Sequence, residues 1–310
     1  MGYCRAMTEL ILHHYDLSPY AEKIRLALGL KGMSWHSVDT PMVLPKADHF
    51  ELTGGYRRVP VLQVGADVYC DTHLIARVLD RIQPAPALSP PGFETVENAL
   101  SRWGETSFMM VIMAYFGIGG IFDDAFMDDR KNTMLAPGTD LEAAPKLLPT
   151  KLLQLKDNIR RLESLLSDGR PFMLGDTACA ADLSTYHPLM MLGLHKKTKN
   201  LLTGADLVGA WMHRIGSIGH GDKTPMDSAD AIAIANAADA IAFESQPVLP
   251  EGMKIGDSVI VIHDDYGSGN VMGQLAASAG DEIAIRRQGE RVGEVVVHFP
   301  RQDYTVIGLS

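Results

Sequence analysis

The sequence predicts three structural units in one chain: a small mixed α/β domain, an all-helical domain and a short all-β module. Strand-like and helix-like patterns alternate through residues 8–82, whereas residues 93–245 are patterned as helices. Residues 246–310 hold short runs rich in Val and Ile, separated by Gly and Asp turns. A linker at 83–92 divides the first two units, because proline interrupts regular structure there. Its prolines are Pro84, Pro86, Pro90 and Pro91.

The α/β domain is expected to contain four strands and two helices. Ile24, Ala27 and Leu28 lie at helical spacing, and Gly65-Ala66-Asp67 forms a turn between two strands. This order predicts a parallel pair of strands extended by a hairpin. The expected strands are 9–15, 35–38, 59–64 and 68–69, and the expected helices are 19–30 and 73–82.

The second domain is expected to be all-α, with one polar interruption. Residues 123–150 carry many Asp residues and three prolines, so we expect this segment on the surface. The expected helices are 96–116, 151–166, 180–194, 205–215 and 228–243.

The last segment reads as a small β-barrel or sandwich. Val295, Val297 and Phe299 alternate with other residues, as in half-buried antiparallel strands. A unit of about 60 residues is near the lower size limit for independent stability, so we expect it to pack on the rest. The expected strands are 258–262, 282–286, 294–299 and 305–309.

Composition excludes several kinds of function. The net charge is −10, and Lys/Arg against Asp/Glu number nine and nine in 1–81, 14 and 20 in 82–245, and five and nine in 246–310. No segment has the basic excess that nucleic-acid binding needs. The longest uncharged apolar stretch, 107–122, is too short to span a membrane, and the eleven histidines lack ligand spacing, so neither a membrane nor a metal is expected.

The cysteines indicate a reducing compartment. There are three, Cys4, Cys70 and Cys179, without a Cys-x-x-Cys pair, so no disulfide framework is supported. The beginning of the chain also lacks the apolar core of a signal peptide. We therefore expect a cytoplasmic protein.

Ser18 is the first candidate for chemistry. It precedes Pro19 at the start of an expected helix, which makes it an N-cap residue. A thiolate at this position would be stabilised by the positive end of the helix and by the serine hydroxyl as donor. Ser is also a common cap, so a purely structural role is the alternative.

Two further motifs could hold a peptide-like ligand. A cis bond between Val59 and Pro60 would leave the Val59 N–H and C=O free, although an edge-strand proline explains the same residues. Asp71 and Thr72 lie between a strand and a helix. They could grip the ammonium and carboxylate of an amino-acid head group, or simply cap the helix.

Taken in order, these motifs resemble the glutathione S-transferase superfamily, cytosolic type, with Ser at the catalytic position. They read Ser-Pro-Tyr-Ala-Glu-Lys, Arg-Val-Pro-Val-Leu and Asp-Thr, with Pro60 placed 42 residues after Ser18 and 11 before Asp71. The resemblance covers about 8–243 and implies a thioredoxin-like first domain and a helical second domain. The β module is an addition to it.

A second match lies in the helical domain. Phe-Met-Leu-Gly-Asp at 172–176, followed by Ala-Ala-Asp-Leu at 180–183, resembles the family's motif for capping a buried helix. The family usually has Ser or Thr three residues before Asp182, and here Cys179 takes that place. Cys179 is expected to pack as a small apolar residue, and a reactive thiol is the alternative.

The resemblance implies an enzyme that uses glutathione as co-substrate and is commonly a homodimer. Branches of the family that reduce disulfides carry Cys at the catalytic position, so Ser18 favours conjugation or isomerisation. The residues assigned by resemblance are Ser18 as catalytic, Val59 and Pro60 for the cysteinyl unit, Asp71 and Thr72 for the γ-glutamyl end, and Arg58 for the glycyl carboxylate. A solvated surface arginine is the alternative for Arg58.

The second substrate is expected to be a small apolar electrophile. Met109, Met113 and Phe116 lie on the helix that, by resemblance, faces the active site, and adaptable methionines suit such a pocket. Ordinary core packing explains the same stripe.

Two other functions remain open at this point. The chain could keep the fold as a binding or scaffolding protein without chemistry, a reading that the additional β module favours. It could also be a glutathione-dependent reductase that relies on Cys70, next to Asp71.

Overall fold

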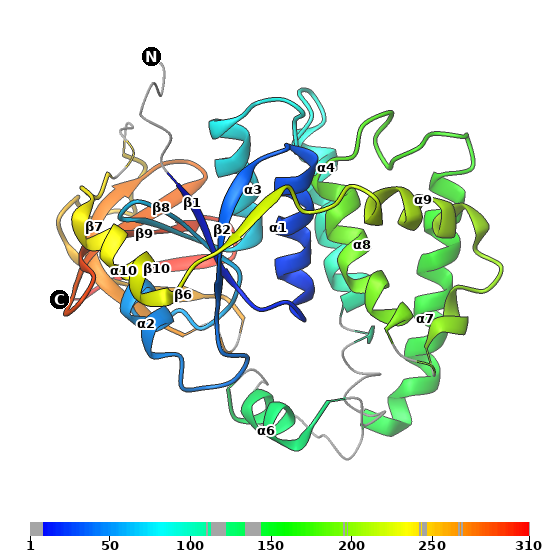
Figure 1. Ribbon diagram of the computed structural model, residues 1–310, viewed down its shortest axis with the longest axis horizontal. Helices are drawn as coiled ribbons and strands as arrows, with labels where there is room; N and C mark the ends of the chain where they lie inside the picture. Colours follow the sequence, from blue (N-terminus) through cyan, green and yellow to red (C-terminus); the bar gives the residue numbers. More distant parts are fainter. Residues whose placement is uncertain are drawn as a thin grey trace.

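The structure is a computed structural model that describes residues 9–109, 111–112, 122–133, 144–194, 196, 198–241, 243, 247–265, 267 and 269–309. Its first unit has the expected thioredoxin-like pattern, and the predicted strands and helices are all present (Figure 1). A short helix, α2, was not predicted. The elements are β1 (Leu10–His14), α1 (Pro19–Leu30), β2 (Ser34–Asp39), α2 (Ala47–Thr53), β3 (Val61–Val64), β4 (Asp67–Cys70) and α3 (Thr72–Ile82).

The middle of the chain is helical, as predicted, with one correction. The polar interruption expected at 123–150 contains α6 (Asp124–Thr133) and the start of α7 (Ala144–Leu165). The α6 helix has few apolar residues, and tertiary bonds of Asp129 and Arg130 fix it to the rest of the molecule. The other elements are α4 (Glu94–Gly104), a π-helical turn (Glu105–Met109), α8 (Ala180–Gly193), a 3-10 turn (Lys199–Leu202) and α9 (Asp206–Gly216).

After α9 the chain returns to the first unit. Residues 222–225 add strand β5 (Asp222–Pro225) beside β2, although no strand was expected there. The helix predicted at 228–243 ends earlier, as α10 (Ser228–Ala237), because Ala238 has extended backbone. The remaining strands are β6 (Ser258–His263), β7 (Val271–Ser278), β8 (Glu282–Gly289), β9 (Gly293–Pro300) and β10 (Tyr304–Gly308), of which β7 was not predicted.

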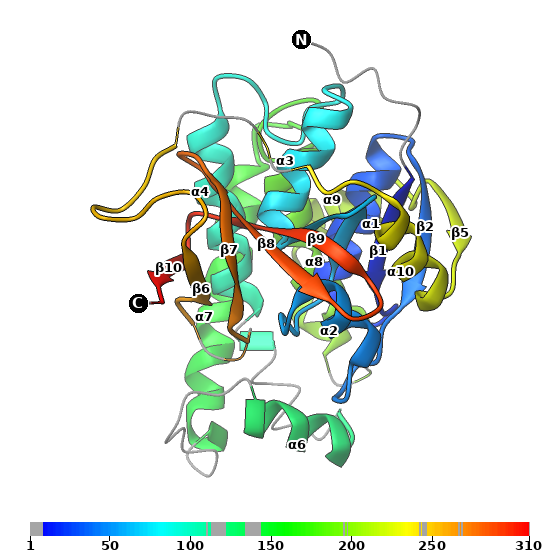
Figure 2. The same cartoon turned by 90° about the vertical axis from the view of Figure 1, so that its left-hand side faces the viewer.

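The C-terminal module, β6 to β10, joins the thioredoxin-like sheet. The ten described strands form one sheet in the order β10-β6-β7-β8-β9-β4-β3-β1-β2-β5, in which β9 pairs in parallel with β4 (Figure 2). Within the module, each strand pairs antiparallel with its neighbours. The expected packing on the rest is therefore achieved by backbone pairing as well as by side chains.

The sheet separates two apolar cores. Leu12 and Leu62 pack with α1, α3 and the helical domain, whereas Ile11, Val61 and Val68 point to the face that carries α2 and α10 (Figure 1). This alternation follows from the two-residue period of a strand.

A buried ionic triad fastens the module to β4. His298 of β9 is 1% exposed; its Nδ1 lies 2.9 Å from Glu282 Oε1 and its Nε2 lies 3.0 Å from Asp67 Oδ1. Burial alone lowers the pKa of His298, but the hydrogen bonds to the Asp67 and Glu282 carboxylates outweigh it and raise the pKa. The charged imidazolium is therefore the form that stabilises this junction.

This triad predicts a loss of stability as pH rises above about 6.5. A histidine whose pKa is raised by folding stabilises the native state fully below the unfolded pKa, and the stabilisation disappears as pH rises through the folded pKa. The free energy of unfolding in urea should fall by about 1.4 kcal/mol for each pH unit between those two values. His298→Gln should flatten this slope, whereas the exposed His213→Gln should keep it. An unchanged slope in His298→Gln would contradict the assignment.

Candidate active site

Strand register brings the three predicted motifs to one edge of the sheet. His13 of β1 is paired with Val61 of β3, and Val61 is paired with Cys70 of β4. Ser18 follows β1, Val59 and Pro60 precede β3, and Asp71 follows β4. Residues that are distant in sequence are therefore neighbours at the N-terminal ends of α1 and α3.

Ser18 caps α1. Its backbone is extended, with φ −70° and ψ 118°, and its Oγ accepts a hydrogen bond from the Ala21 N–H at 3.2 Å. The side chain is buried, at 2% exposure. Because capping uses the hydroxyl as an acceptor, its hydrogen is still a donor that can be directed at another atom. The structural role and the predicted catalytic role of Ser18 are thus compatible.

The Val59–Pro60 peptide bond is cis, as expected. Pro60 is buried and Val59 is half-buried. Within the described part of the chain, no hydrogen bond outside the regular elements uses the Val59 backbone. Its N–H and C=O are therefore suited to pair with an extended peptide-like ligand.

Asp71 has the positive φ of 77°, a rare conformation for a non-glycine residue. Its Oδ1 accepts a hydrogen bond from the His73 N–H at 2.8 Å and so caps α3. Its Oδ2 lies 3.5 Å from the hydroxyl of Tyr304 in β10. Tyr304 also contacts the Tyr56 hydroxyl at 3.3 Å, so the C-terminal module reaches this corner of the site.

Thr72 belongs to a buried cluster of charged groups. Lys23 Nζ donates to Thr72 Oγ1 at 3.1 Å and to Glu105 Oε1 at 2.8 Å, and Glu105 Oε2 lies 3.0 Å from His73 Nε2. Burial alone raises the pKa of Glu105, but Lys23 and His73 outweigh it and hold the pKa well below its usual range. Glu105 begins the π-helical turn, a feature often found at functional sites.

Tyr20 and His187 extend this cluster toward the helical domain. Their rings lie 4.8 Å apart, and His187 Nε2 is 3.8 Å from Glu105 Oε1. Burial raises the pKa of Tyr20, and the carboxylates of Glu105 and Asp71 add to the rise. Sequence reasoning missed these partners because Lys23, Glu105 and His187 lie on three different helices; a buried lysine is not visible in a local pattern.

Arg58 lies against the C-terminal module. Its Nη2 donates to Asp265 Oδ1 at 2.5 Å, and its Nη1 is 3.3 Å from His263 Nε2. Burial alone lowers the pKa of Arg58, but contact with anionic and hydroxyl groups raises it overall. The sequence contained no signal for this pairing, because Asp265 is one of many Asp residues in polar turns.

The neighbouring Arg57 binds α6. Its Nη2 donates to Asp129 Oδ2 at 2.6 Å, and Asp129 Oδ1 accepts from the Leu44 N–H at 3.2 Å. Arg130 Nη2 donates to the Met42 carbonyl at 3.2 Å. The α6 helix therefore fastens the loop between β2 and α2 beside the predicted site.

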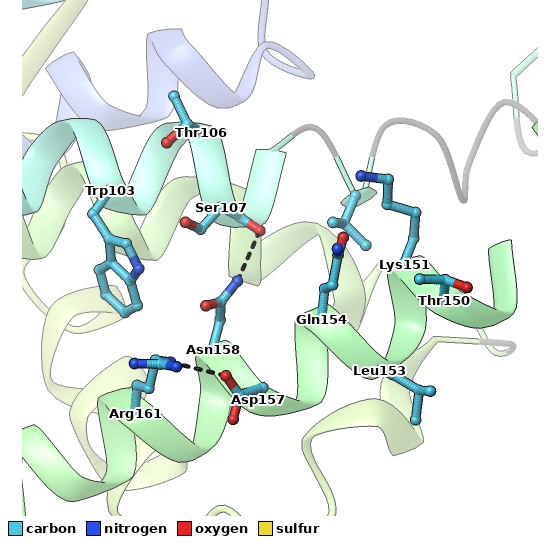
Figure 3. A pocket seen from close by; sticks show the side chains of 11 residues that line it. Trp103, Thr106, Ser107, Thr150, Lys151, Leu153, Gln154, Asp157, Asn158 and Arg161 are labelled. Carbon is cyan, nitrogen blue, oxygen red and sulfur yellow. Dashed lines mark hydrogen bonds and ion pairs between the residues drawn. The ribbon is translucent and has the colours of Figure 1, made fainter. Parts of the chain in front are cut away.

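The predicted electrophile pocket is only partly described. Met109 is buried in the core at 5% exposure, and Met113 and Phe116 lie outside the described residues. A cavity of about 650 Å³ opens between α4 and α7, where Trp103 and Ser107 face Asn158 and Arg161 (Figure 3). Its lining mixes polar side chains, such as Gln154 and Asp157, with apolar ones, such as Trp103 and Leu153.

The described cysteines are unsuited to nucleophilic attack. Cys70 is fully buried, and burial raises its pKa well above the usual range. Burial also raises the pKa of Cys179, whose Sγ lies 3.3 Å from Asp182 Oδ2. Cys179 thus takes part in capping α8.

The part of the chain that the structure describes contains neither a candidate metal site nor a helix that could span a membrane. Its His, Cys, Asp and Glu side chains form no group of three or more that could hold a metal ion. Among its helices, none combines the length and apolar character that a membrane span requires.

A thioredoxin-like domain with a cis-proline, followed by an all-helical domain, defines the class of the protein, and comparison identifies the family. The family model for the glutathione S-transferase N-terminal domain matches residues 12–87. A crystal structure of a GST-like protein from Pseudomonas syringae is 37% identical, covering 96% of this chain and 100% of that chain with a TM-score of 0.80. The chain belongs to the glutathione S-transferase superfamily.

More distant structures share the fold alone. A glutathione S-transferase from Rhodospirillum rubrum F11 is 18% identical, covering 67% of this chain and 88% of its own, with a TM-score of 0.53. Poplar glutathione transferase F1 is 15% identical, with coverages of 67% and 92% and a TM-score of 0.52. No curated protein gave a significant match.

Proposed function

We propose that the protein is a glutathione transferase that activates the glutathione thiol for attack on a small apolar electrophile or for isomerisation. The observation that carries this proposal is the meeting of Ser18, the cis Val59–Pro60 bond and Asp71 at one sheet edge. These groups supply a hydroxyl donor, two backbone hydrogen-bonding groups and a carboxylate. That set matches the thiol, the cysteinyl backbone and the ammonium of glutathione.

Each residue has a distinct task in this proposal. The Ser18 hydroxyl donates a hydrogen bond to the thiolate, and the N-terminal end of α1 adds its positive field, so the pKa of the thiol falls. The Val59 backbone aligns the cysteinyl unit. Asp71 pairs with the γ-glutamyl ammonium, while Thr72 and the N–H groups that begin α3 lie toward its carboxylate.

A non-catalytic binding protein is the second candidate, and two observations favour it. Ser18 is nearly inaccessible, and both Arg58 and Asp71 already contact the C-terminal module. A glutathione-dependent reductase is less well supported, because the only described cysteine near the site, Cys70, is buried with a raised pKa. A homodimer in the cytoplasm remains part of the proposal on grounds of family resemblance and cysteine content.

Ser18→Ala tests the proposal. Loss of one preorganised donor to a developing anion costs about 100-fold in kcat, so turnover with an apolar electrophile should fall by about that factor. Glutathione binding, measured by calorimetry, should be retained. Ser18→Thr keeps both the hydroxyl and the cap and should recover most of the turnover.

Stability must be measured on the same variants, because loss of the cap costs about 1 kcal/mol. Unchanged turnover in Ser18→Ala would refute the role of Ser18. Glutathione binding by the wild type without thiol consumption across a panel of electrophiles would favour the binding protein instead.

A further inference from the structure

The C-terminal module contacts two of the residues predicted to bind glutathione. The turn after β6 places Asp265 against Arg58, with Oδ1 at 2.5 Å from Nη2, and Tyr304 of β10 places its hydroxyl 3.5 Å from Asp71. Both contacts join residues at opposite ends of the chain. The module therefore forms part of the wall of the candidate site, in addition to extending the sheet.

Asp265 is held in this place by its surroundings. His263 Nδ1 lies 2.7 Å from Asp265 Oδ1 and 2.9 Å from the Asp265 backbone nitrogen. Further along the turn, Gly269 has φ 87° and approaches Gly55 so closely that a Cβ at 269 would lie 2.2 Å from the Gly55 carbonyl oxygen. Gly269 is thus packed against the loop that leads to Arg58.

The ion pair with Asp265 occupies the guanidinium of Arg58, a group that recognises carboxylates. An arginine guanidinium offers a planar set of donors that fits a carboxylate, and Asp265 supplies one from within the chain. Burial alone raises the pKa of Asp265, but His263 and Arg58 outweigh it and lower the pKa, so the group stays anionic near neutral pH. At 54% exposure, the Asp265 side chain remains accessible to exchange with a ligand.

We propose that Asp265 is a specificity-determining residue that competes, as a built-in carboxylate, with an acidic end of the ligand at Arg58. This inference rests on the proposed function. A thiol ligand with a carboxylate at that end must share Arg58 with Asp265, so two anions come close together. A ligand with an ester or amide at that end meets no such repulsion. The site therefore favours γ-glutamyl thiols whose far end is uncharged.

Two probes that differ in one charge test the proposal. Glutathione and its glycyl monoethyl ester are titrated by calorimetry into the full-length protein, and the ratio of the two Kd values is compared among variants. In Asp265→Asn, glutathione should bind about fivefold more tightly relative to the ester, which is the effect of one half-exposed ion pair. Asp303→Asn is the matched control, because Asp303 is another module carboxylate but pairs with Arg102 of α4. It should leave the ratio unchanged.

The outcomes separate this inference from the proposed function. If both thiols bind and Asp265→Asn leaves the ratio unchanged, or weakens glutathione relative to the ester, competition by Asp265 is refuted while the proposed function stands. If neither thiol binds to the folded wild type, the proposed function fails and the inference fails with it.

Discussion

Asp182→Ala is expected to lower the free energy of unfolding by about 3–5 kcal/mol, since it removes a buried charged acceptor from its donors. Asp182 is fully buried, and Oδ1 accepts from the Met173 N–H and the Trp211 Nε1–H, both at 2.8 Å. Oδ2 accepts from the Cys179 N–H at 3.0 Å. Alanine would leave three buried N–H donors without an acceptor.

Urea unfolding followed by tryptophan fluorescence measures this effect, because Trp211 itself is one of the donors. Asp182→Asn keeps the side-chain shape and one carbonyl acceptor, so it should cost less. Asp206→Ala, an exposed residue in the first turn of α9, is the control and should cost less than 1 kcal/mol. A loss below 1 kcal/mol in Asp182→Ala would show that these bonds do not hold α8 in place.

Glu105→Gln is expected to destabilise the protein by a similar amount, about 3–5 kcal/mol, because it leaves the Lys23 ammonium buried without its counter-ion. Lys23 is 1% exposed, and its other described partner is the uncharged Thr72 hydroxyl. The cost should appear in the free energy of unfolding, together with a weaker connection between α1 and the helical domain.

A double-mutant cycle separates the pair from the loss of one partner. Lys23→Met combined with Glu105→Gln removes both charges, so the double variant should recover much of the stability that Glu105→Gln loses. Asp157→Asn, which breaks exposed pairs with Arg160 and Arg161 on α7, should cost under about 1 kcal/mol. Equal losses in Glu105→Gln and in the double variant would argue against a buried-charge penalty.

The sequence predicted the helices and strands that have their own periodic pattern of apolar residues. It did not predict the strands that form only because a neighbouring strand pairs with them. The helix at α1 and the strands β3 and β4 are recognisable from spacing, caps and turns. In contrast, β5 is a polar, exposed segment that becomes a strand because β2 offers a free edge. The β7 strand begins with Val, Met and Gly and bears a register shift, which weakens its alternation.

The same distinction applies to the site. Ser18, Pro60 and Asp71 belong to short motifs, so sequence could predict them together with the thioredoxin-like and helical domains. Contacts between distant segments bring three further residues to the site, and a local sequence pattern cannot predict such contacts. These residues are Asp265, Tyr304 and Glu105. The module was predicted as a β unit. Its pairing with β4 was not predicted, because β4 and its partner strand β9 are far apart in the sequence.

That pairing has a consequence for the newly synthesised chain. The edges of β2 and β4 receive their partners, β5 and β9, from segments that leave the ribosome much later. Until then, the nascent first unit presents two unpaired strand edges, which can recruit strands from other chains. Synthesis that is interrupted before β9 would therefore release chains prone to self-association at the β4 edge.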